Sequence, residues 1–242
     1  MTLKLRSAAV SDRGLIRSAN QDSVHAGEWL VVVADGMGGM AAGDLASAIA
    51  IEAIAPLDVA LPDDRLAEAL REAIGAASER IRAAVTDDPT REGMGTTLTA
   101  LLCSATGTAV ALVHLGDSRA YLLRGGVLEQ MTKDDTFVQM LVDEGMITAE
   151  EAINHPRRAV VTRALQGEPV TAAYGAMPPV VGDRWMLCSD GLSNVVPAET
   201  MAEVLTTYPD RQACAQRLVD LALEGGGPDN VTVIVADIVE ES

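Results

Sequence analysis

Three apolar runs in this 242-residue chain each end at an aspartate. The runs are 31–35, 113–117 and 186–190, and a fourth acid, Asp229, stands just before the run 231–235. Short β-branched runs that stop at a turn predict buried strands, so we expect all four carboxylates at the rims of sheets. Acids gathered at such a rim repel one another unless a cation neutralises them. Oxygen-only ligands favour Mg²⁺ or Mn²⁺ over zinc.

Asp35 and Gly36 open a glycine-rich turn, and Asp190 with Gly191 repeats the unit. A strand followed by Asp-Gly is, by itself, an ordinary turn. The many glycines after the first run indicate close backbone approach, with the Gly36 carbonyl available as a ligand. Acids so far apart in sequence are better explained by convergence on one site. Two cations about 3.5–4 Å apart there would activate a water as a nucleophile.

Arg17 is the candidate to bind a phosphate, because its guanidinium offers a bidentate fork. A lone arginine is more often a surface residue. Asn20 and Asp22 follow closely and are candidates to orient Arg17 or metal-bound waters, and Asn230 stands in the same way beside Asp229.

The composition predicts one folded domain over residues 1–242. Hydrophobic residues make up 48% of the chain and no Pro/Ser-rich linker divides it. The net charge of −17 argues against nucleic acid as a partner and favours a monomer. Three cysteines without CxxC spacing are expected to be buried hydrophobes in a reducing compartment. The sequence has no signal peptide or long uncharged apolar run, so we expect a cytoplasmic protein with no membrane segment.

Hydrophobic periodicity and turn signals divide the chain into strands that come in hairpin-connected blocks and long helices that come in pairs. Strands are expected at 3–10, 24–34, 96–102, 109–115, 120–123, 128–131, 170–176, 184–189 and 231–239, and helices at 42–55, 63–85, 197–206 and 211–224. Asp63 and Asp64 are expected to cap the second helix, and Gly125-Gly126 to form a hairpin turn. This order predicts an α+β fold, a four-layer α-β-β-α sandwich of two antiparallel sheets flanked by helices.

A polar segment at about 133–166 interrupts the strands and is expected to form a surface flap. It should hold a short helix at 137–144 and another capped by Thr148. The Asp134-Asp135 pair at its start is more typical of a helix cap than of a metal ligand. Its methionines are more typical of packing than of recognition.

The three histidines have ordinary interpretations. His114 lies within a strand and is expected in the core or on a sheet face, whereas His25 is expected to be exposed. His155, in the flap, is the one histidine with a credible role near a substrate.

Six short motifs give the chain a family resemblance. In order they are Arg-x-x-Asn-Gln-Asp (17–22), Asp-Gly-Met-Gly-Gly (35–39), Gly-Met-Gly-Thr-Thr (93–97), Gly-Asp-Ser-Arg (116–119), Cys-Ser-Asp-Gly-Leu (188–192) and Gly-Gly-x-Asp-Asn-Val-Thr (226–232). From about residue 7 to 235 the chain resembles the bacterial PP2C-type (PPM family) metal-dependent serine/threonine protein phosphatases. No single motif would be specific, but six in this order are.

The resemblance implies roles for the acids. Asp35, Asp190 and Asp229 would hold a first Mn²⁺ or Mg²⁺, and Asp35 with the Gly36 carbonyl a second. Asp117 would help Asp190 bind a third, weaker ion. The segment 133–166 matches the mobile flap beside the catalytic cleft of such relatives.

The resemblance also implies the reaction and its partners. Water would attack phosphoserine or phosphothreonine directly, without a phosphoenzyme. The partners would be phosphorylated proteins, among them serine/threonine kinases and their substrates. The chain would be either a complete cytoplasmic protein or the cytoplasmic domain of a longer, membrane-anchored one.

Two departures from the family pattern bear on the chemistry. Relatives often carry a histidine where this chain has Met37 or Met40, and methionine cannot donate a proton to the leaving group. Gln21 stands where eukaryotic relatives have glutamate, which removes one charge near the metals.

Two other functions stay open from the sequence. A non-catalytic phosphoprotein-binding relative would be favoured by loss of the metal acids, yet all of them are present. A metal-dependent hydrolase of small phosphorylated metabolites is the second alternative.

Overall fold

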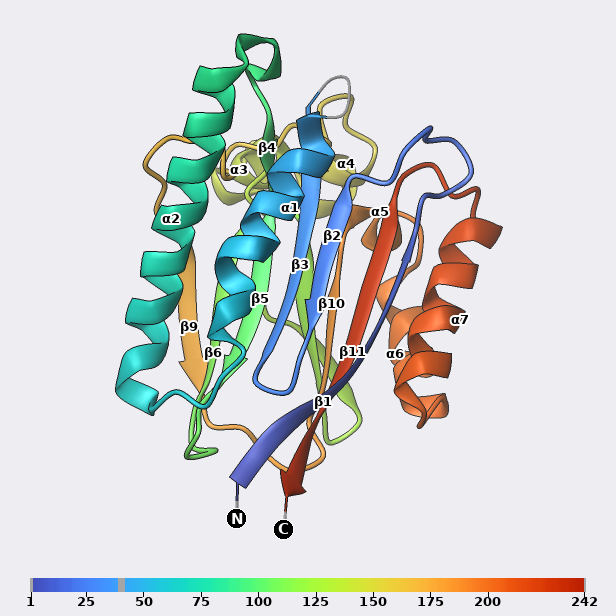
Figure 1. The fold of residues 1–242 in the computed structure, drawn as a ribbon. Coiled ribbons are helices and arrows are strands. Elements are labelled where there is room, and N and C mark those ends of the chain that lie inside the picture. The colour runs from blue at the N-terminus through green and yellow to red at the C-terminus, as the bar shows by residue number, and fades with distance from the viewer. Residues whose placement is uncertain (1, 39–41, 242) are drawn as a thin grey trace.

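The computed structural model describes residues 2–38 and 42–241 and folds them into two antiparallel sheets covered by helices (Figure 1). The strands are β1 Thr2–Asp12, β2 Asp22–Ala26, β3 Leu30–Met37, β4 Gly95–Thr96, β5 Leu98–Cys103, β6 Val110–Leu115, β7 Arg119–Arg124, β8 Val127–Gln130, β9 Ala173–Met177, β10 Arg184–Cys188 and β11 Val231–Glu241. The first sheet has the order β1-β11-β10-β7-β8. The second has the order β2-β3-β5-β6-β9, with β4 paired to β3.

The helices form the outer layers. They are α1 Ala42–Ile54, α2 Leu66–Asp87, α3 Phe137–Asp143, α4 Ala149–Ile153, α5 Asp190–Ser193, α6 Ala198–Thr207 and α7 Arg211–Glu224. Figure 1 shows α1 and α2 covering the second sheet and α6 and α7 covering the first. The short helices α3 and α4 lie in the segment between β8 and β9.

Alternation along the strands builds three apolar layers. In β3, Val31 and Val33 belong to the core between the two sheets, together with Trp185 of β10. Val32 and Ala34 point the other way and pack with α1 and α2. A strand buried on both faces must be apolar at every position, which explains the run of residues before Asp35. The predicted four-layer α+β sandwich is confirmed.

The α2 helix buries one stripe of its surface. Leu66, Leu70, Ile74, Ala77 and Ile81 recur every three or four residues and are all buried. This spacing places them on one face of a helix, and that face packs against α1.

Local turn and cap signals also give the expected structures. Gly125 and Gly126 both have positive φ, +60° and +82°, at the turn that joins β7 to β8. At α4 the Thr148 hydroxyl accepts from the Glu151 N–H at 3.2 Å, and the Glu151 carboxylate accepts from the Thr148 N–H at 2.8 Å.

Several expected elements are wrong in detail. Residues 24–34 are not one strand, because β2 and β3 form a hairpin of their own that turns between Ala26 and Leu30. The strand expected at 170–176 begins only at Ala173. The short helix α5, which starts at Asp190, was not expected.

Two acidic pairs are not helix caps. Asp63 begins a single 3-10 turn and accepts hydrogen bonds from Thr106 and Thr108 instead. Thr136 caps α3, while Asp134 pairs with Arg119 and Asp135 with Arg163. Tertiary arginine and threonine donors compete successfully for these carboxylates.

The histidine and cysteine expectations divide. His114 is buried, as predicted. His25 is half-buried rather than exposed, because its imidazole pairs with Asp58 at 3.1 Å. Cys103, Cys188 and Cys214 are all free and buried, as predicted.

Candidate metal centre

The predicted acids come from one end of the sandwich. Asp22 starts β2 and lies directly opposite Asp35 of β3 in the strand register. Asp190 follows β10 as the first residue of α5, and Asp229 precedes β11. Figure 1 shows these strand ends together with α5, at the end opposite the chain termini. Asp117 lies in the turn between β6 and β7.

The negative charges of these carboxylates raise one another's pKa values. Burial raises the pKa of Asp35 well above its ordinary value, and the charges of Asp22 and Asp190 add to the shift. Burial, and then the charge of Asp229, raises the pKa of Asp190 to about 6. Burial, and then the charge of Asp190, raises the pKa of Asp117 to about 7. Mutual repulsion between buried acids of this kind is relieved by a nearby cation.

Arg17 lies within this cluster and pairs with Asp229. Its Nη2 donates to Asp229 Oδ2 at 2.7 Å, and about half of the Arg17 side chain is exposed. This hydrogen bond raises the pKa of Arg17, with further contributions from Asp190 and Asp35. The predicted phosphate-binding group therefore occupies a predicted metal ligand in this structure.

Asn230 fixes the loop that carries Arg17. Its Nδ2 donates to the carbonyls of Arg13 and Ala19, at 2.9 and 2.8 Å, and its Oδ1 accepts from the Gln21 N–H at 2.8 Å. Both ends of the loop are thus tied to the residue next to Asp229. The side chain acts on the loop backbone rather than on Arg17 itself.

Asn20 and Asp22 are linked through hydroxyl groups. Asn20 Nδ2 donates to Ser11 Oγ at 2.8 Å, and Ser11 shares a 2.7 Å hydrogen bond with Thr232. Asp22 Oδ2 accepts from Ser189 Oγ at 2.8 Å, while Asp22 Oδ1 is buried without a partner.

Two site residues were missed by sequence reasoning. Ser189, which holds Asp22, stands in the Cys-Ser-Asp-Gly motif. Thr97 Oγ1 accepts from the Asp35 N–H at 2.9 Å and stands in the Gly-Thr-Thr motif. The motifs that contain these residues were recognised. The roles of their hydroxyl groups, however, become visible only from contacts in the tertiary structure.

Close backbone approach explains two glycines of the site. A Cβ on Gly36 would lie 2.1 Å from the Gly43 carbonyl oxygen. A Cβ on Gly191 would lie 1.9 Å from the Asn230 carbonyl oxygen. Both contacts are with backbone, so no larger residue fits without moving the site.

The donor set suits hard divalent cations, although the side chains are not gathered around one point. Among the residues that the structure describes, no three His, Cys, Asp or Glu side chains are grouped closely enough to hold an ion. Two features account for this. Arg17 is hydrogen-bonded to Asp229. The predicted ligands also include the Gly36 carbonyl and waters, which Mg²⁺ ordinarily retains. The unpartnered Asp22 Oδ1 and the raised carboxylate pKa values fit a cation. Met37 is half-buried beside the site, and Met40 lies outside the described residues.

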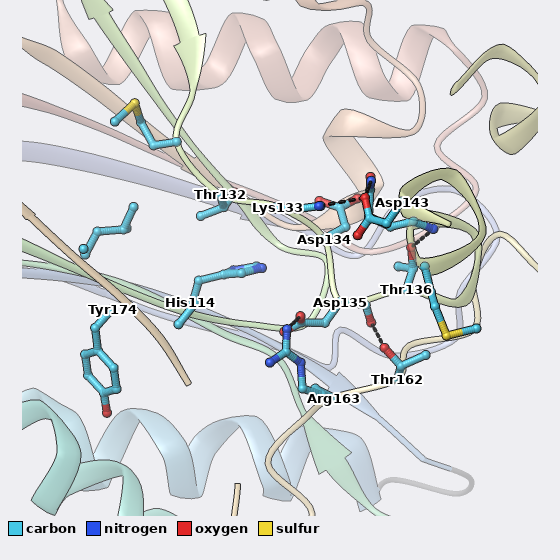
Figure 2. A pocket seen from close by; sticks show the side chains of 16 residues that line it. His114, Thr132, Lys133, Asp134, Asp135, Thr136, Asp143, Thr162, Arg163 and Tyr174 are labelled. Carbon is cyan, nitrogen blue, oxygen red and sulfur yellow. Dashed lines mark hydrogen bonds and ion pairs between the residues drawn. The ribbon is translucent and has the colours of Figure 1, made fainter. Parts of the chain in front are cut away.

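A cavity of about 560 Å³ lies beside this centre rather than within it. Residues of β6, β9 and the start of the 133–166 segment line it, and none of the predicted site residues does. Figure 2 shows its charged end, where Asp135 and Arg163 pair. Asp135 also holds Gly116, the neighbour of Asp117: the Gly116 N–H donates to Asp135 Oδ2 at 3.1 Å, and the Asp135 N–H donates to the Gly116 carbonyl at 2.7 Å.

Comparison with known proteins decides the family. The profile of the family described as Protein phosphatase 2C matches residues 17–222. The chain belongs to the protein phosphatase 2C family. The serine/threonine protein phosphatase PstP of Mycobacterium tuberculosis is 54% identical over 240 residues, which cover 99% of this chain and 46% of that protein. The serine/threonine phosphatase stp of Listeria monocytogenes is 35% identical, over 94% of this chain and 93% of that protein.

Solved structures of this family match the fold closely. A crystal structure of M. tuberculosis PstP/Ppp superposes with a TM-score of 0.94 at 53% identity, covering 98% of this chain and all of that one. The PstP catalytic domain in complex with two manganese ions gives 0.92, over 99% of this chain. The chain spans about half the length of the curated M. tuberculosis relatives. No helix in the described residues is long and apolar enough to cross a membrane.

Proposed function

We propose that this member of the protein phosphatase 2C family is a metal-dependent serine/threonine protein phosphatase. The cluster of Asp35, Asp190 and Asp229 around the guanidinium of Arg17 is the observation that carries the proposal. Buried acids bind divalent cations, and the arginine supplies a fork for phosphate. The manganese complex of the 53% identical PstP domain supports Mn²⁺ as a metal for this donor set.

Each acid has a proposed place. Asp35, Asp190 and Asp229 would hold one ion, and Asp35 with the Gly36 carbonyl the other. Asp117, whose pKa is raised to about 7 by burial and by Asp190, would share a third ion with Asp190. When bound, the ions supply a water acidic enough to attack phosphorus and neutralise charge on the phosphoryl oxygens.

The protein's own groups supply binding and orientation. Arg17 leaves Asp229 and binds two oxygens of the phosphoryl group, and the loop tied by Asn230 keeps its backbone in place. Ser189 fixes Asp22 beside Asp35. Phosphoryl transfer needs mainly such positioning and charge stabilisation. Met37 has no proton to give, so the leaving alkoxide takes its proton from water.

The proposed substrates are phosphorylated proteins, including serine/threonine kinases and their targets, and the proposed compartment is the cytoplasm. Three free, buried thiols fit a reducing compartment. A non-catalytic role is disfavoured because every predicted metal acid is retained.

Metal reconstitution tests the proposal. Protein stripped with a chelator should be inactive on an aryl phosphate and on a phosphothreonine peptide, and Mn²⁺ or Mg²⁺ should restore both activities. No turnover at saturating Mn²⁺ would refute a phosphatase. Turnover of sugar phosphates in preference to the peptide would instead identify a metabolite hydrolase.

A further inference from the structure

The cavity of Figure 2 lies between the two sheets at their open edge and is distinct from the metal centre. Leu112 and His114 line it from β6, and Met131 lines it from the opposite sheet's side. Leu112 and Met131 also pack against the core between the sheets. At about 560 Å³ the cavity is within the size range of small-ligand pockets.

The buried imidazole of His114 presents one nitrogen without a partner. The side chain is 97% buried, and its Nε2 has no hydrogen-bond partner. Figure 2 shows the ring extending across the cavity toward the loop of Asp134 and Asp135.

The neighbouring contacts determine which nitrogen carries the proton. Thr99 Oγ1 lies 3.0 Å from His114 Nδ1 and 2.9 Å from the Ser118 carbonyl oxygen. The carbonyl can only accept, so it receives the single hydroxyl proton of Thr99. Nδ1 then donates to Thr99 Oγ1 and Nε2 is left as an acceptor, while the backbone groups of Lys133 and Gly116 lie close enough to the ring to act on its pKa. Burial lowers the pKa of His114, which keeps the ring neutral.

The two acids beside His114 are more buried than the cations that pair with the acidic lining. Among these cations Arg119 is 25% exposed, and Lys133, paired with Asp143, is 64% exposed. The side chains of Asp134 and Asp135 are only 12% and 4% exposed, whereas that of Arg163 is 53% exposed. Each carboxylate can accept about four hydrogen bonds, so both keep acceptor capacity beside their arginine partners. These two acids are the charges that act most strongly on His114.

We propose that this cavity binds an organic cation, an ammonium or guanidinium group on a short aliphatic stem. The cationic head donates to His114 Nε2 and to the free lone pairs of Asp134 and Asp135. The stem lies against Leu112, Met131 and Ala173. A neutral donor could also hydrogen-bond to the histidine and the two carboxylates, but it would lack the charge attraction that the carboxylates add for a cation.

One position allows the cavity to be filled without touching the buried histidine. Gly175 of β9 is paired with Leu112 in the strand register, so its side chain would stand on the face of Leu112 that lines the cavity. A Cβ there meets nothing within 4 Å. Gly75, within α2, has equally open space and lies outside the cavity.

The binding test compares two isosteric probes on the Mn²⁺-loaded protein by calorimetry. Butylguanidinium should bind with Kd of about 1 mM, a modest efficiency for eight heavy atoms. Neutral butylurea should bind at least 10-fold more weakly. Gly175→Leu should weaken butylguanidinium binding at least 10-fold, and Gly75→Leu should leave it unchanged. In ¹⁵N spectra, the His114 Nε2 resonance should shift with butylguanidinium.

Three results would overturn the proposal: equal affinity for the two probes, binding that survives Gly175→Leu, which indicates adsorption to the acidic surface, or equal loss of binding in both glycine variants, which indicates that the effect of Gly175→Leu is not local to the cavity. This test does not depend on phosphatase activity. Failure of metal reconstitution would therefore refute the proposed function and leave the cation site in place.

Pairs of peptides then test whether the cation is a side chain of the substrate or a free amine. This experiment rests on the proposed function. Phosphothreonine peptides with arginine at one position between −4 and +4 are compared with citrulline, the neutral isostere. If the cation is a substrate side chain, one arginine position raises kcat/KM about 5- to 10-fold, and Gly175→Leu abolishes the difference. Equal kcat/KM for every pair, with butylguanidinium still bound, assigns the cavity to a free amine.

Discussion

Arg17 is a cation among carboxylates that are proposed to hold metal cations of their own. It is paired with Asp229 at 2.7 Å while Asp190 and Asp35 also attract it. If Asp229 holds a divalent ion as proposed, the ion would compete with Arg17 for this carboxylate, and displacement of Arg17 would free its guanidinium for phosphate. On this proposal metal and arginine would compete, while metal and phosphate would support each other.

Replacing Arg17 should separate these two effects. Arg17→Gln should raise KM for a phosphothreonine peptide about 10-fold or more, because a charge-assisted bidentate contact contributes about 1.5–3 kcal/mol. The same change should tighten Mn²⁺ binding, measured by calorimetry, because Asp229 loses its competitor. Arg13→Gln is the control, since the Arg13 side chain donates a long hydrogen bond to the Ser18 carbonyl at 3.5 Å and only the Arg13 backbone carbonyl meets Asn230 in the described residues. Unchanged KM would contradict the phosphate role.

Asp35 is proposed to contact both ions, so its loss should be the most severe of the acid variants. Asp35→Asn should reduce Mn²⁺-dependent turnover at least 10³-fold and lower the number of bound ions measured by calorimetry. Asp117→Asn should cost less, because it removes a ligand to a third ion only. Retained activity in Asp35→Asn would mean that the proposed ligand set is wrong.

At the scale of the secondary-structure elements, the positions of the site residues depend on the contacts between the segments that follow and precede the strands. The short helix α5 packs on β11 so closely that Gly191 has no room for a side chain against the Asn230 backbone. Asn230 in turn ties down the loop before β2. One crowded junction thus sets Asp190, Asp229 and Arg17 relative to one another.

A methyl group at this junction should be costly. Gly191→Ala should lower the free energy of unfolding by about 2–4 kcal/mol, because the contact at 1.9 Å is with backbone and cannot be relieved by a rotamer change. Gly75→Ala, in the open interior of α2, should raise it by about 0.5–1 kcal/mol. Urea unfolding of both variants measures the difference, and similar small effects would show that the junction is not rigid.

For the whole molecule, the acid cluster makes stability depend on pH and metal together. Asp35, Asp117 and Asp190 have raised pKa values, the last two at about 7 and about 6. Between about pH 4 and pH 7 these three sites therefore bind more protons in the folded protein than in the unfolded chain, and their number outweighs the opposite effect of the lowered pKa of His114, so metal-free stability falls as the pH rises through that range. Metal cations that replace the protons on these carboxylates should remove this loss of stability.

Unfolding in urea at pH 5 and pH 8 tests this linkage. With chelator, the wild type should be less stable at pH 8 than at pH 5, and Mn²⁺ should stabilise it mainly at pH 8. Asp117→Asn should recover about 1–3 kcal/mol at pH 8 without metal, because one buried charge is gone. An equal pH response in wild type and variant would contradict the raised pKa of Asp117.

The sequence by itself determined the fold class and the residues that belong to the centre. In strands buried on both faces, such as β3, the run before the acid is apolar at every position, and the acid at the end of the run interrupts that pattern clearly. Helix α2 shows a clear stripe, and Thr148 a complete capping box. These signals are local, because they depend on the periodicity and hydrogen bonding of adjacent residues.

The tertiary structure decided which partners those residues take. Asp63 and Asp134 resemble helix caps in the sequence. In the structure, however, Asp63 accepts hydrogen bonds from threonines and Asp134 from an arginine, all from other segments of the chain. The pairing of Arg17 with Asp229 spans 212 positions, and the junction of Gly191 with Asn230 depends on the packing of α5 against β11. Sequence patterns indicate which face of an element a residue occupies. The partner that neutralises a charged residue depends on the distances between segments, and only the packed chain sets those distances.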